Sequence, residues 1–494
     1  MSPAACALGL DLGTSSAKAV VLSVSGAVLA QAAAGYPVIS PQPGYAESDP
    51  RLWWSAVVSC TREAVAAAGG SPPVAIGLSG QMHGLVMAAA DGRALRPALL
   101  WADSRATGSL RAYRELGRAA LDRLANPLFP GMAGPMLAWV AACEPDVYAG
   151  ARWALSPKDW LRGRLTGEIH AEPSDASATL LYDVAGDRWD LGVVEALGLD
   201  AGLLAPLLPS SAAVAGRLTA SAADELGLPA GLPVAAGAGD TAAAVLGSGI
   251  FGASDIQLTV GTGAQVIRPL AAPVNRAEAG VHLFRLASPS GWYQMGATLS
   301  AGLSLNWVRE VLNASWEELY ASASRASAPD DPVFVPHLTG ERTPYCDPSL
   351  RGSWSSLALA SDRASLLRSA LEGTAFAIRD ALDALLGAAG PVPACLRLAG
   401  GGTVAAGWRQ LLADVLGVPL YAVDVPAASG RGAALLGAIA AGLLGFDDCA
   451  GALAPPAALA AEPDRGRAAL HAERYARFQE VVQALRPRSQ EGPP

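Results

Sequence analysis

Two aspartates stand in glycine-rich turns directly after short apolar runs, and this pattern constrains the fold more than any other. The first turn is Asp11-Leu-Gly-Thr-Ser15, after residues 7–10, and the second is Gly237-Ala-Gly-Asp240-Thr-Ala, after residues 233–236. An apolar run that ends in such a turn is typical of a strand in an α/β sheet, which binds ligands beyond the carboxyl ends of its strands. Each aspartate therefore lies where backbone amides can hold a phosphate group, and the pair indicates phosphoryl transfer.

A third turn, Val260-Gly-Thr-Gly263, repeats the Gly-Thr pair in the second half of the chain. Two Gly-Thr turns about half a chain apart predict two similar lobes that face one nucleotide. Strand-like and helix-like segments alternate along the sequence, which predicts the α/β class with a mixed sheet.

The expected segments begin with three short strands in an antiparallel meander, followed by helices and further strands. In the first half the strands are 7–12, 17–23, 27–32, 74–78 and 84–89, and the helices are 50–68, 109–116 and 134–143. The second half restarts this order with strands 256–260, 264–269, 292–296 and 395–398 and helices 364–386, 408–416 and 471–485. We therefore expect a structural pseudo-repeat.

Because the order of strands and helices begins again in the second half, the sequence also predicts the domain boundaries. Residues 1–245 form the first lobe, residues 246–446 form the second lobe, and residues 447–494 form a C-terminal extension with one helix. The start of that extension, residues 447–462, carries little pattern.

Composition excludes several classes of protein. The chain of 494 residues is 51% hydrophobic and 16% charged, which excludes an intrinsically disordered protein. A net charge of −9 argues against nucleic acid as a partner, because binding to a phosphate backbone needs a clustered basic face. The longest uncharged apolar stretch near the end, residues 432–446, is shorter than the run of about 18 residues that crosses a bilayer, so no membrane association is expected.

The six cysteines are scattered, with no C-x-x-C pair and no nearby histidine cluster. Reduced thiols are therefore expected, and not disulfides or a zinc site. The first residues lack the basic region and cleavage site of a signal peptide, so we expect a cytoplasmic location.

The first turn offers the amides and hydroxyls of Gly13, Thr14 and Ser15, which can hold a phosphate without a lysine. Asp11 beside them can bind Mg²⁺ through water. The alternative is a simple turn that ends a strand. The Gly-Thr pair recurs in the second half of the chain, however, and this recurrence favours a functional turn. The pattern G-x-x-x-x-G-K-[ST] is absent from the sequence, so a P-loop enzyme is not supported.

A dinucleotide site is a second interpretation of the glycine-rich turns. Residues 237–242 and 400–405 both match G-x-G-x-x-A, as a Rossmann fingerprint would. An aspartate inside the turn would repel a pyrophosphate, whereas Asp240 is suited to a base that accepts a hydroxyl proton. A nicotinamide dehydrogenase stays open as the alternative from another class.

Three further clusters place polar side chains in loops. Gln81-Met82-His83-Gly84 follows a predicted strand, and His83 beside a glycine favours a functional role. The other two are Trp101-Ala-Asp103-Ser-Arg105 and Gly340-Glu-Arg342-Thr-Pro344, for which surface salt bridges are the ordinary interpretation.

Together these motifs resemble the FGGY family of carbohydrate kinases, and within it the xylulose kinases most. The similarity spans nearly the whole chain. It is carried by Leu10 to Ser15, Gly80 to Gly84, Trp101 to Arg105, Pro157-Lys-Asp159, Leu165 to Glu168, Gly237 to Asp240, Gly340 to Pro344, Leu371-Glu-Gly373 and Gly400 to Gly402. Gln-Met-His-Gly is typical of xylulose kinases, whereas glycerol kinases have an arginine-glutamate pair there.

The resemblance implies two actin-like lobes of the ribonuclease H type, with ATP and the sugar in the cleft between them. The N-terminal lobe would bind mainly the sugar, and the C-terminal lobe mainly ATP. Asp240 would be the general base for the O5 hydroxyl of a ketose, D-xylulose, and Asp11 would support Mg²⁺. The implied ketose contacts are Gln81, Met82, His83, Asp103, Asp240 and Thr241, and the implied nucleotide contacts are Thr14, Ser15, Gly261, Thr262, Gly263, Gly400, Gly401 and Gly402.

Three residues depart from the family pattern. Ala102 replaces the usual asparagine or glutamine of the W-x-D-x-R motif, and Thr241 replaces the asparagine that often follows the base. Both bear on the choice of sugar. Gly263 replaces a serine of the second Gly-Thr turn, which removes one hydroxyl but keeps the amides.

Other functions stay open beside ATP-dependent phosphorylation of D-xylulose in pentose catabolism. One is a kinase for another ketose or polyol, such as ribulose. Another is a non-enzymatic sugar-sensing regulator, but such regulators commonly carry an added helix-turn-helix, and this sequence begins at its first predicted strand. The expected partner is a small ketose, and a homodimer is compatible with the sequence.

Overall fold

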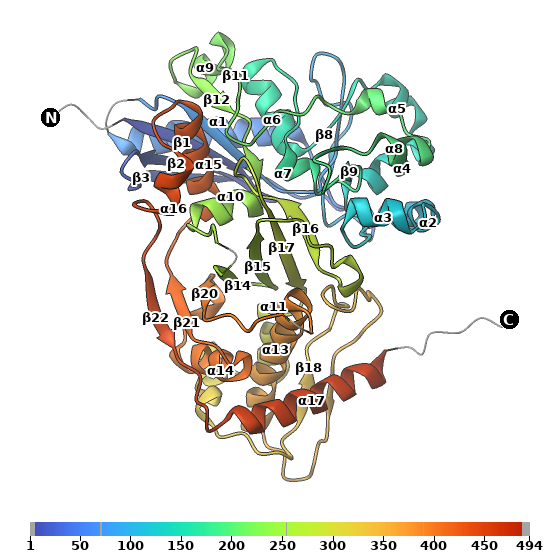
Figure 1. The fold of residues 1–494 in the computed structure, drawn as a ribbon, viewed down its shortest axis with the longest axis vertical. Coiled ribbons are helices and arrows are strands. Elements are labelled where there is room, and N and C mark those ends of the chain that lie inside the picture. The colour runs from blue at the N-terminus through green and yellow to red at the C-terminus, as the bar shows by residue number, and fades with distance from the viewer. Residues whose placement is uncertain (1–4, 70–71, 253, 389, 487–494) are drawn as a thin grey trace.

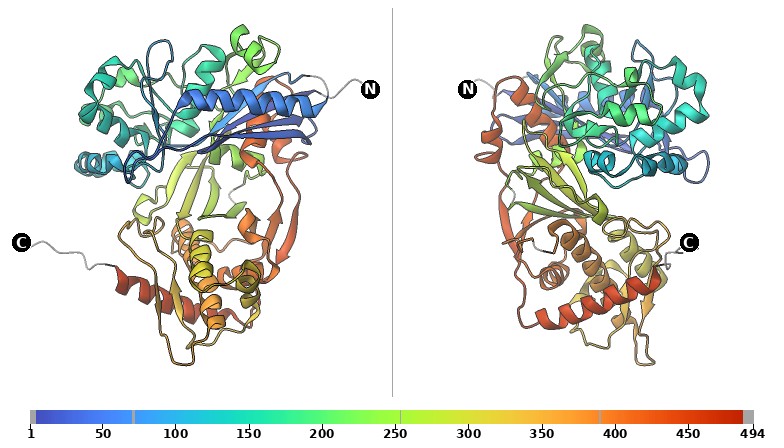
Figure 2. Two further views of the ribbon diagram at one scale, coloured as in Figure 1. Left: turned by 180° about the vertical axis from the view of Figure 1, so that it is seen from behind. Right: turned by 45° about the vertical axis from the view of Figure 1, so that its right-hand side comes forward.

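The structure is a computed structural model that describes residues 5–69, 72–252, 254–388 and 390–486 (Figure 1). Two seven-stranded sheets form the centres of two lobes. The first sheet lies at the top of Figure 1 and the second lies below it, and both views of Figure 2 show the same separation. The expected α/β class with two lobes is confirmed.

The N-terminal sheet has the strand order β11-β12-β5-β1-β2-β3, and β13 also pairs with β5. Its first three strands form the predicted antiparallel meander, and β5 runs parallel to β1. The strands are β1 (Cys6–Leu12), β2 (Ser16–Ser23), β3 (Val28–Gly35), β5 (Ile76–Gly80), β11 (Val214–Arg217), β12 (Pro233–Ala235) and β13 (Ala238–Gly239).

The second sheet has the order β16-β17-β15-β14-β20-β21-β22. Strand β14 pairs antiparallel with β15 and parallel with β20, as β1 does with β2 and β5, so the predicted pseudo-repeat is present. The strands are β14 (Ile256–Val260), β15 (Ala264–Leu270), β16 (His282–Arg285), β17 (Trp292–Thr298), β20 (Leu396–Ala399), β21 (Leu420–Val423) and β22 (Ala457–Ala461).

Short strand pairs complete the lobes outside the two sheets. They are β4 (Glu47–Ser48) with β7 (Ala98–Leu99), β6 (Val86–Ala88) with β8 (Trp153–Leu155), β9 (Tyr182–Asp183) with β10 (Arg188–Trp189), and β18 (Val333–Val335) with β19 (Ser353–Ser355). Both large sheets mix parallel and antiparallel neighbours. A Rossmann domain needs a mostly parallel sheet, so the dinucleotide interpretation is not supported.

The helices surround these sheets. In the first lobe they are α1 (Pro50–Ala68), α2 (Leu110–Glu115), α3 (Arg118–Leu124), α4 (Ala133–Cys143), α5 (Pro145–Gly150), α6 (Pro157–Thr166), α7 (Pro173–Ala176), α8 (Leu191–Ala196), α9 (Ala220–Leu226) and α10 (Asp240–Gly247). Later in the chain they are α11 (Gly302–Val311), α12 (Trp316–Ala321), α13 (Arg363–Leu386), α14 (Ala406–Leu416), α15 (Ala428–Ala440), α16 (Phe446–Ala450) and α17 (Ala468–Leu485).

Helix α1 has the predicted bounds, because its ends carry ordinary signals. The Asp49 side chain accepts a hydrogen bond of 2.9 Å from the Arg51 amide, and Pro50 occupies the first helical position. Gly69 ends the helix in the left-handed conformation, with φ of 62°. Trp53, fully buried, faces the core of the first lobe.

Helix α15 lies in the predicted second lobe by sequence, yet it packs against strands of the first sheet (Figures 1 and 2). Glycines permit this approach. A Cβ atom on Gly9 would lie 2.0 Å from the carbonyl oxygen of Gly430, and one on Gly77 would lie 1.8 Å from that of Ala433. Chain order alone therefore does not assign each element to a lobe.

The C-terminal segment adds more than the one helix expected. Besides α17 it supplies most of the short helix α16, and strand β22 joins the second sheet antiparallel to β21. This strand has the sequence Ala-Ala-Leu-Ala-Ala, which lacks the β-branched and alternating residues by which a strand is recognised. Helix α17 packs against the core of the second lobe through Phe478 and Val482.

Candidate active site

Asp11 and Asp240 lie at the same edge of the first sheet, on opposite sides of β5. Leu12 of β1 and Gly239 of β13 both pair with Gly80, the last residue of β5. Both pairings are parallel, so the carboxyl ends of the three strands meet at one edge. The structure thus brings the two aspartates together from positions more than 200 residues apart in the sequence.

Asp11 is buried, and the Ser79 hydroxyl donates a hydrogen bond of 2.8 Å to its Oδ1. Burial raises the pKa of this carboxyl, while the hydrogen bond from Ser79 and the charge of Lys18 act in the opposite direction. The ionised form of Asp11 is therefore not fully stabilised by protein groups, as expected for a carboxylate that binds a cation.

Asp240 is the first residue of α10, after the turn that leaves β13. Gly237 has a φ of 80°, and a Cβ atom there would lie 2.6 Å from the carbonyl oxygen of Leu78, so this turn requires glycine. The Thr241 amide and hydroxyl lie 2.6 Å and 3.2 Å from Oδ1 of Asp240. Burial, and then the negative charge of Asp11, raises the pKa of Asp240 to about 7.

The first Gly-Thr turn is held by three side chains from other segments. Tyr36 donates its hydroxyl proton to the carbonyl oxygen of Gly13 at 2.5 Å, and Gln81 donates to the same oxygen at 3.2 Å. The Trp101 indole donates a hydrogen bond of 3.0 Å to the Thr14 hydroxyl. The predicted sugar and phosphate residues are therefore linked directly.

His83 donates from Nδ1 to the carbonyl oxygen of Ala178 at 2.8 Å, since a carbonyl oxygen only accepts. Burial lowers the pKa of His83 to about 4. The imidazole is therefore neutral near pH 7, with Nε2 left as an acceptor. Met82 beside it is buried, and its sulfur lies 3.6 Å from the Tyr293 hydroxyl of β17.

Asp103 is occupied by protein groups. Its carboxylate accepts a hydrogen bond of 2.7 Å from the Ala46 amide and pairs with Arg105 at 2.8 Å. Arg105 also pairs with Glu47 at 2.7 Å. These contacts hold the loop that contains Ala102, whose side chain is exposed, so a direct contact between Asp103 and the sugar stays a prediction.

The second Gly-Thr turn links β14 to β15. A Cβ atom on Gly263 would lie 2.3 Å from the carbonyl oxygen of Thr298, so the serine found elsewhere in the family does not fit this backbone. The Gly302 amide donates a hydrogen bond of 3.0 Å to the carbonyl oxygen of Gly261, which places the start of α11 against the turn.

The turn Gly400 to Gly402 follows β20, the parallel neighbour of β14. Gly400 has a φ of 96°, and a Cβ atom there would lie 2.3 Å from the carbonyl oxygen of Val260. The predicted nucleotide contacts Gly261, Thr262 and Gly263 therefore lie beside those of Gly400, Gly401 and Gly402, at one edge of the second sheet.

Sequence reasoning missed the residues of the second half that reach the sugar side. His282 of β16 donates from Nδ1 to the Asn126 side-chain oxygen at 3.2 Å, and its Nε2 lies 2.7 Å from the Arg342 guanidinium. Its ring centre is 6.4 Å from that of His83. Arg342 belongs to the motif Gly340 to Pro344, which the sequence analysis singled out. His282 is a single histidine within a strand, and no sequence pattern marks it as functional.

The described residues contain no group of three or more histidine, cysteine, aspartate or glutamate side chains arranged to hold a metal ion. Mg²⁺ in a kinase is commonly bound by one or two carboxylates together with substrate phosphates. The buried Asp11, with the charge of Asp240 nearby, fits that smaller ligand set.

Cys60, Cys143, Cys346, Cys395 and Cys449 are free thiols. Within the described part of the chain, none of the helices has the length and apolar composition that a membrane crossing requires.

The N-terminal domain model of the FGGY family of carbohydrate kinases matches residues 6–247, and its C-terminal domain model matches residues 257–441. The chain is 35% identical over 441 residues to the xylulose kinase of Escherichia coli (strain K12), covering 88% of this chain and 90% of that protein. The chain belongs to the FGGY family.

Solved structures support the same family. A crystal structure described as a xyloylose kinase from Brucella ovis superposes with a TM-score of 0.91 at 36% identity, covering 97% of this chain and 99% of that one. A xylulose kinase from Rhodospirillum rubrum gives 0.88 at 28% identity, covering 97% and 99%. The two lobes of this FGGY kinase are therefore actin-like, and the protein is a phosphotransferase that uses ATP to phosphorylate a carbohydrate hydroxyl.

Proposed function

We propose that this FGGY kinase phosphorylates D-xylulose at O5 to give D-xylulose 5-phosphate in pentose catabolism. The observation that carries the proposal is Asp240, a partly buried carboxylate beside Asp11 whose pKa is raised to about 7. A general base works best when its pKa is near the working pH. The names of the similar proteins, which are xylulose kinases, support the choice of sugar.

In the reaction, Asp240 accepts the proton of the sugar 5-hydroxyl while that oxygen attacks the γ-phosphorus of ATP. The new O5–P bond forms as the bond between this phosphorus and the β,γ-bridging oxygen breaks, and ADP leaves. The Thr241 amide holds Oδ1 of Asp240 at 2.6 Å and so orients the carboxylate. Most of the rate enhancement comes from positioning and charge stabilisation, because phosphoryl transfer needs little covalent help.

Two acceptors suit the hydroxyl groups of a sugar. Nε2 of His83 accepts because Nδ1 carries the proton. The side-chain oxygen of Gln81 is buried and has no hydrogen-bond partner within the described residues, and such an orphan acceptor is stabilised by a hydroxyl donor. Met82 adds an apolar surface, and Asp103 with Thr241 completes the proposed set of sugar contacts.

On the nucleotide side, the proposed phosphate contacts are the two Gly-Thr turns and the turn after β20. Thr14 and Ser15 belong to the first turn, Gly261, Thr262 and Gly263 to the second, and Gly400, Gly401 and Gly402 to the third. Backbone amides of such turns form concave sites for anions.

Asp11 is the proposed support for Mg²⁺. When bound, the ion would neutralise charge on the phosphate oxygens. We expect Asp11→Ala to impair ATP turnover far more than sugar binding, which isothermal calorimetry with D-xylulose separates from an ADP-release assay. Lost sugar affinity with intact ATP turnover would contradict this assignment.

An ADP-release assay across a panel of ketoses and polyols tests the substrate. The proposal expects the highest kcat/KM with D-xylulose. A higher value with D-ribulose or a polyol would assign that substrate instead. A cytoplasmic location and a homodimer stay predictions.

A further inference from the structure

A buried network of charged side chains lies behind the turn that carries Asp240, on helices α6 and α7. Lys158, Asp159 and Arg162 of α6, together with Glu172 and Asp175, are all at most 2% exposed. Lys158 lies 2.5 Å from Asp159 and 3.5 Å from Glu172. None of these residues has a role in the reaction proposed above.

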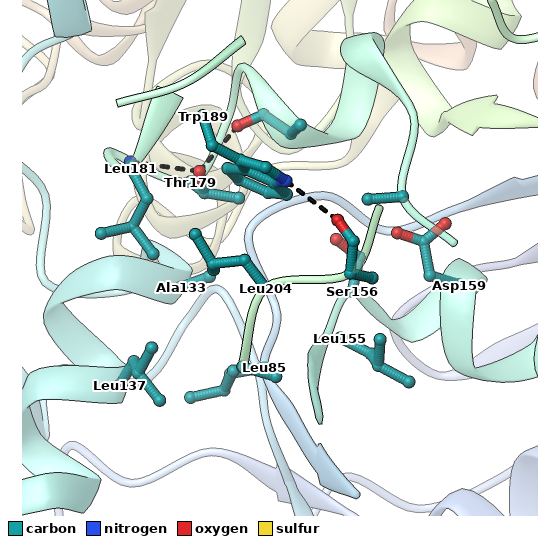
Figure 3. A pocket seen from close by; sticks show the side chains of 14 residues that line it. Leu85, Ala133, Leu137, Leu155, Ser156, Asp159, Thr179, Leu181, Trp189 and Leu204 are labelled. Carbon is teal, nitrogen blue, oxygen red and sulfur yellow. Dashed lines mark hydrogen bonds between the residues drawn. The ribbon is translucent and has the colours of Figure 1, made fainter. Parts of the chain in front are cut away.

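Figure 3 shows the surroundings of Asp159, one member of this network. Asp159 stands at one side of a pocket whose other walls are mostly apolar, including Leu85, Leu155 and Leu204. Apolar walls give the carboxylate no hydrogen bonds, so Lys158 and Arg162 must supply them. An ionised group in such surroundings is stable only when it is fully paired.

Asp175 completes the charge balance. Both its carboxyl oxygens are buried without a hydrogen-bond partner among the described residues, and Lys158 lies 3.7 Å away. Burial, against the opposing charge of Lys158, raises the pKa of Asp175 well above its ordinary value. This shift favours the protonated form of Asp175, while Lys158 and Arg162 pair with Asp159 and Lys158 also lies near Glu172.

The network contacts the Asp240 segment at both of its ends. At the start, Arg162 donates a hydrogen bond of 2.7 Å to the carbonyl oxygen of Ala236 while it pairs with Asp159, also at 2.7 Å. At the end, the Gly239 amide donates a hydrogen bond of 3.0 Å to the Ser174 hydroxyl. Ser174 in turn donates to Glu172 at 2.7 Å.

We propose that Ser174, oriented by Glu172, and Arg162 are positioning residues for Asp240, because they fix both ends of residues 236–239, from which Asp240 extends. This inference rests on the proposed role of Asp240 as the general base. A small displacement of a base costs turnover more than it costs substrate binding, since the transition state needs the closer geometry.

Ser174→Ala tests the proposal, and Ser211→Ala is its matched control. The Ser211 hydroxyl also donates to Glu172, at 2.8 Å, but it does not contact the Asp240 segment through its side chain. Each change therefore removes one buried hydrogen bond to the same carboxylate. We expect Ser174→Ala to lower kcat by about 10- to 100-fold with KM for the sugar within about twofold.

Ser211→Ala should keep kcat within about twofold of the unaltered protein and should lose less thermal stability than Ser174→Ala, which also leaves the Gly239 amide without its partner. Equal kcat values for the two variants would overturn the proposal. If Ser174→Ala does not fold, Ser174→Cys fills the site with a slightly larger thiol that accepts hydrogen bonds only weakly, and it should still lower kcat. An unchanged kcat in a folded Ser174→Cys protein would also overturn it.

Kinetics of Asp240→Asn and of the unaltered protein with a sugar panel separate this proposal from the proposed function. If the unaltered protein prefers another sugar to D-xylulose, the substrate assignment fails, and the two serine variants are compared with the preferred sugar. If Asp240→Asn keeps full activity, the base assignment fails, and the positioning proposal fails with it. If Asp240→Asn is inactive and the serine variants do not differ, only the positioning proposal fails.

Discussion

Asp11 and Asp240 flank strand β5 at one sheet edge, and burial together with the negative charge of Asp11 raises the pKa of Asp240 to about 7. In the proposed mechanism the two carboxylates have different roles in one site. Asp11 would support the metal on the phosphate side, and Asp240, with its raised pKa, would accept the proton.

This relationship predicts the pH dependence of the reaction. Asp240 must be ionised to accept a proton, so kcat/KM should fall as the pH drops through about 7. Asp11→Asn removes a neighbouring negative charge, which lowers the pKa of Asp240 and should move the acid limb of the profile to lower pH. Profiles of kcat/KM for both proteins measure this shift. An acid limb that stays in place, or moves to higher pH, would separate Asp240 from Asp11.

Much of the fold around the candidate site was predictable because its signals are local. Both turns that carry the aspartates follow apolar strands, and the second contains Gly237, whose backbone conformation favours glycine. Helix α1 and strand β14 have the bounds that the sequence predicts, since caps and turn residues mark their ends.

The features that the sequence did not predict depend on contacts between segments that are distant in the sequence. Nothing near Ser174 in the sequence indicates that its hydroxyl meets the Gly239 amide, 65 residues away. His282 comes from the second lobe to the vicinity of His83, and α15 returns to the first sheet through glycine contacts. Such features follow from tertiary packing, which residue patterns do not encode.

The second Gly-Thr turn yields a test of backbone fit. Gly263→Ser would place a Cβ atom 2.3 Å from the carbonyl oxygen of Thr298, so we expect a destabilisation of about 1–3 kcal/mol. Gly401→Ser is the control, because a Cβ atom there meets no atom within 4 Å. Differential scanning calorimetry compares the two. A Gly263→Ser protein with the melting temperature of the control would show that the turn adjusts freely.

The departures at Ala102 and Thr241 predict modest discrimination among ketoses. If each lacks one ordinary hydrogen bond to a sugar hydroxyl, the deficit is roughly 0.5–1.5 kcal/mol apiece, or about 2- to 13-fold in kcat/KM. Combining Ala102→Asn with Thr241→Asn should therefore raise kcat/KM for D-xylulose relative to D-ribulose. Parallel kinetics with both sugars measure this ratio. An unchanged or reversed ratio would leave sugar choice to Met82 and His83.

Helix α17 is anchored through Glu372, which predicts how stability depends on pH. Burial opposes ionisation of Glu372, but the contact with His471, whose Nδ1 lies 3.2 Å from the carboxylate, and the charges of Arg368 and Arg474 outweigh it and lower its pKa to about 2. A lowered folded-state pKa means that the stabilisation is complete above the unfolded value of 4.5 and is lost as the pH falls toward 2.

Glu372→Gln should therefore destabilise the second lobe by about 3–5 kcal/mol at pH 7, because it leaves buried cations without their carboxylate. The difference from the unaltered protein should shrink at pH 3.5. Thermal unfolding at both pH values checks this. The exposed pair of Glu318 with Arg363 gives the control, since Glu318→Gln should change the melting temperature little. Equal effects of the two substitutions would contradict the anchoring role.

The role of Asp240 as general base is tested most directly by D-xylulose-dependent ADP release, measured for the unaltered protein and for Asp240→Asn together with their melting temperatures at pH 8. Asparagine is nearly isosteric and can still accept the Thr241 amide, but it cannot take a proton from the sugar. Because the raised pKa makes ionised Asp240 a cost to folding above pH 7, the melting temperature should not fall. We expect rapid turnover by the unaltered protein and a kcat about 10²–10⁴-fold lower in the variant. A folded Asp240→Asn protein with near-parental kcat would contradict it.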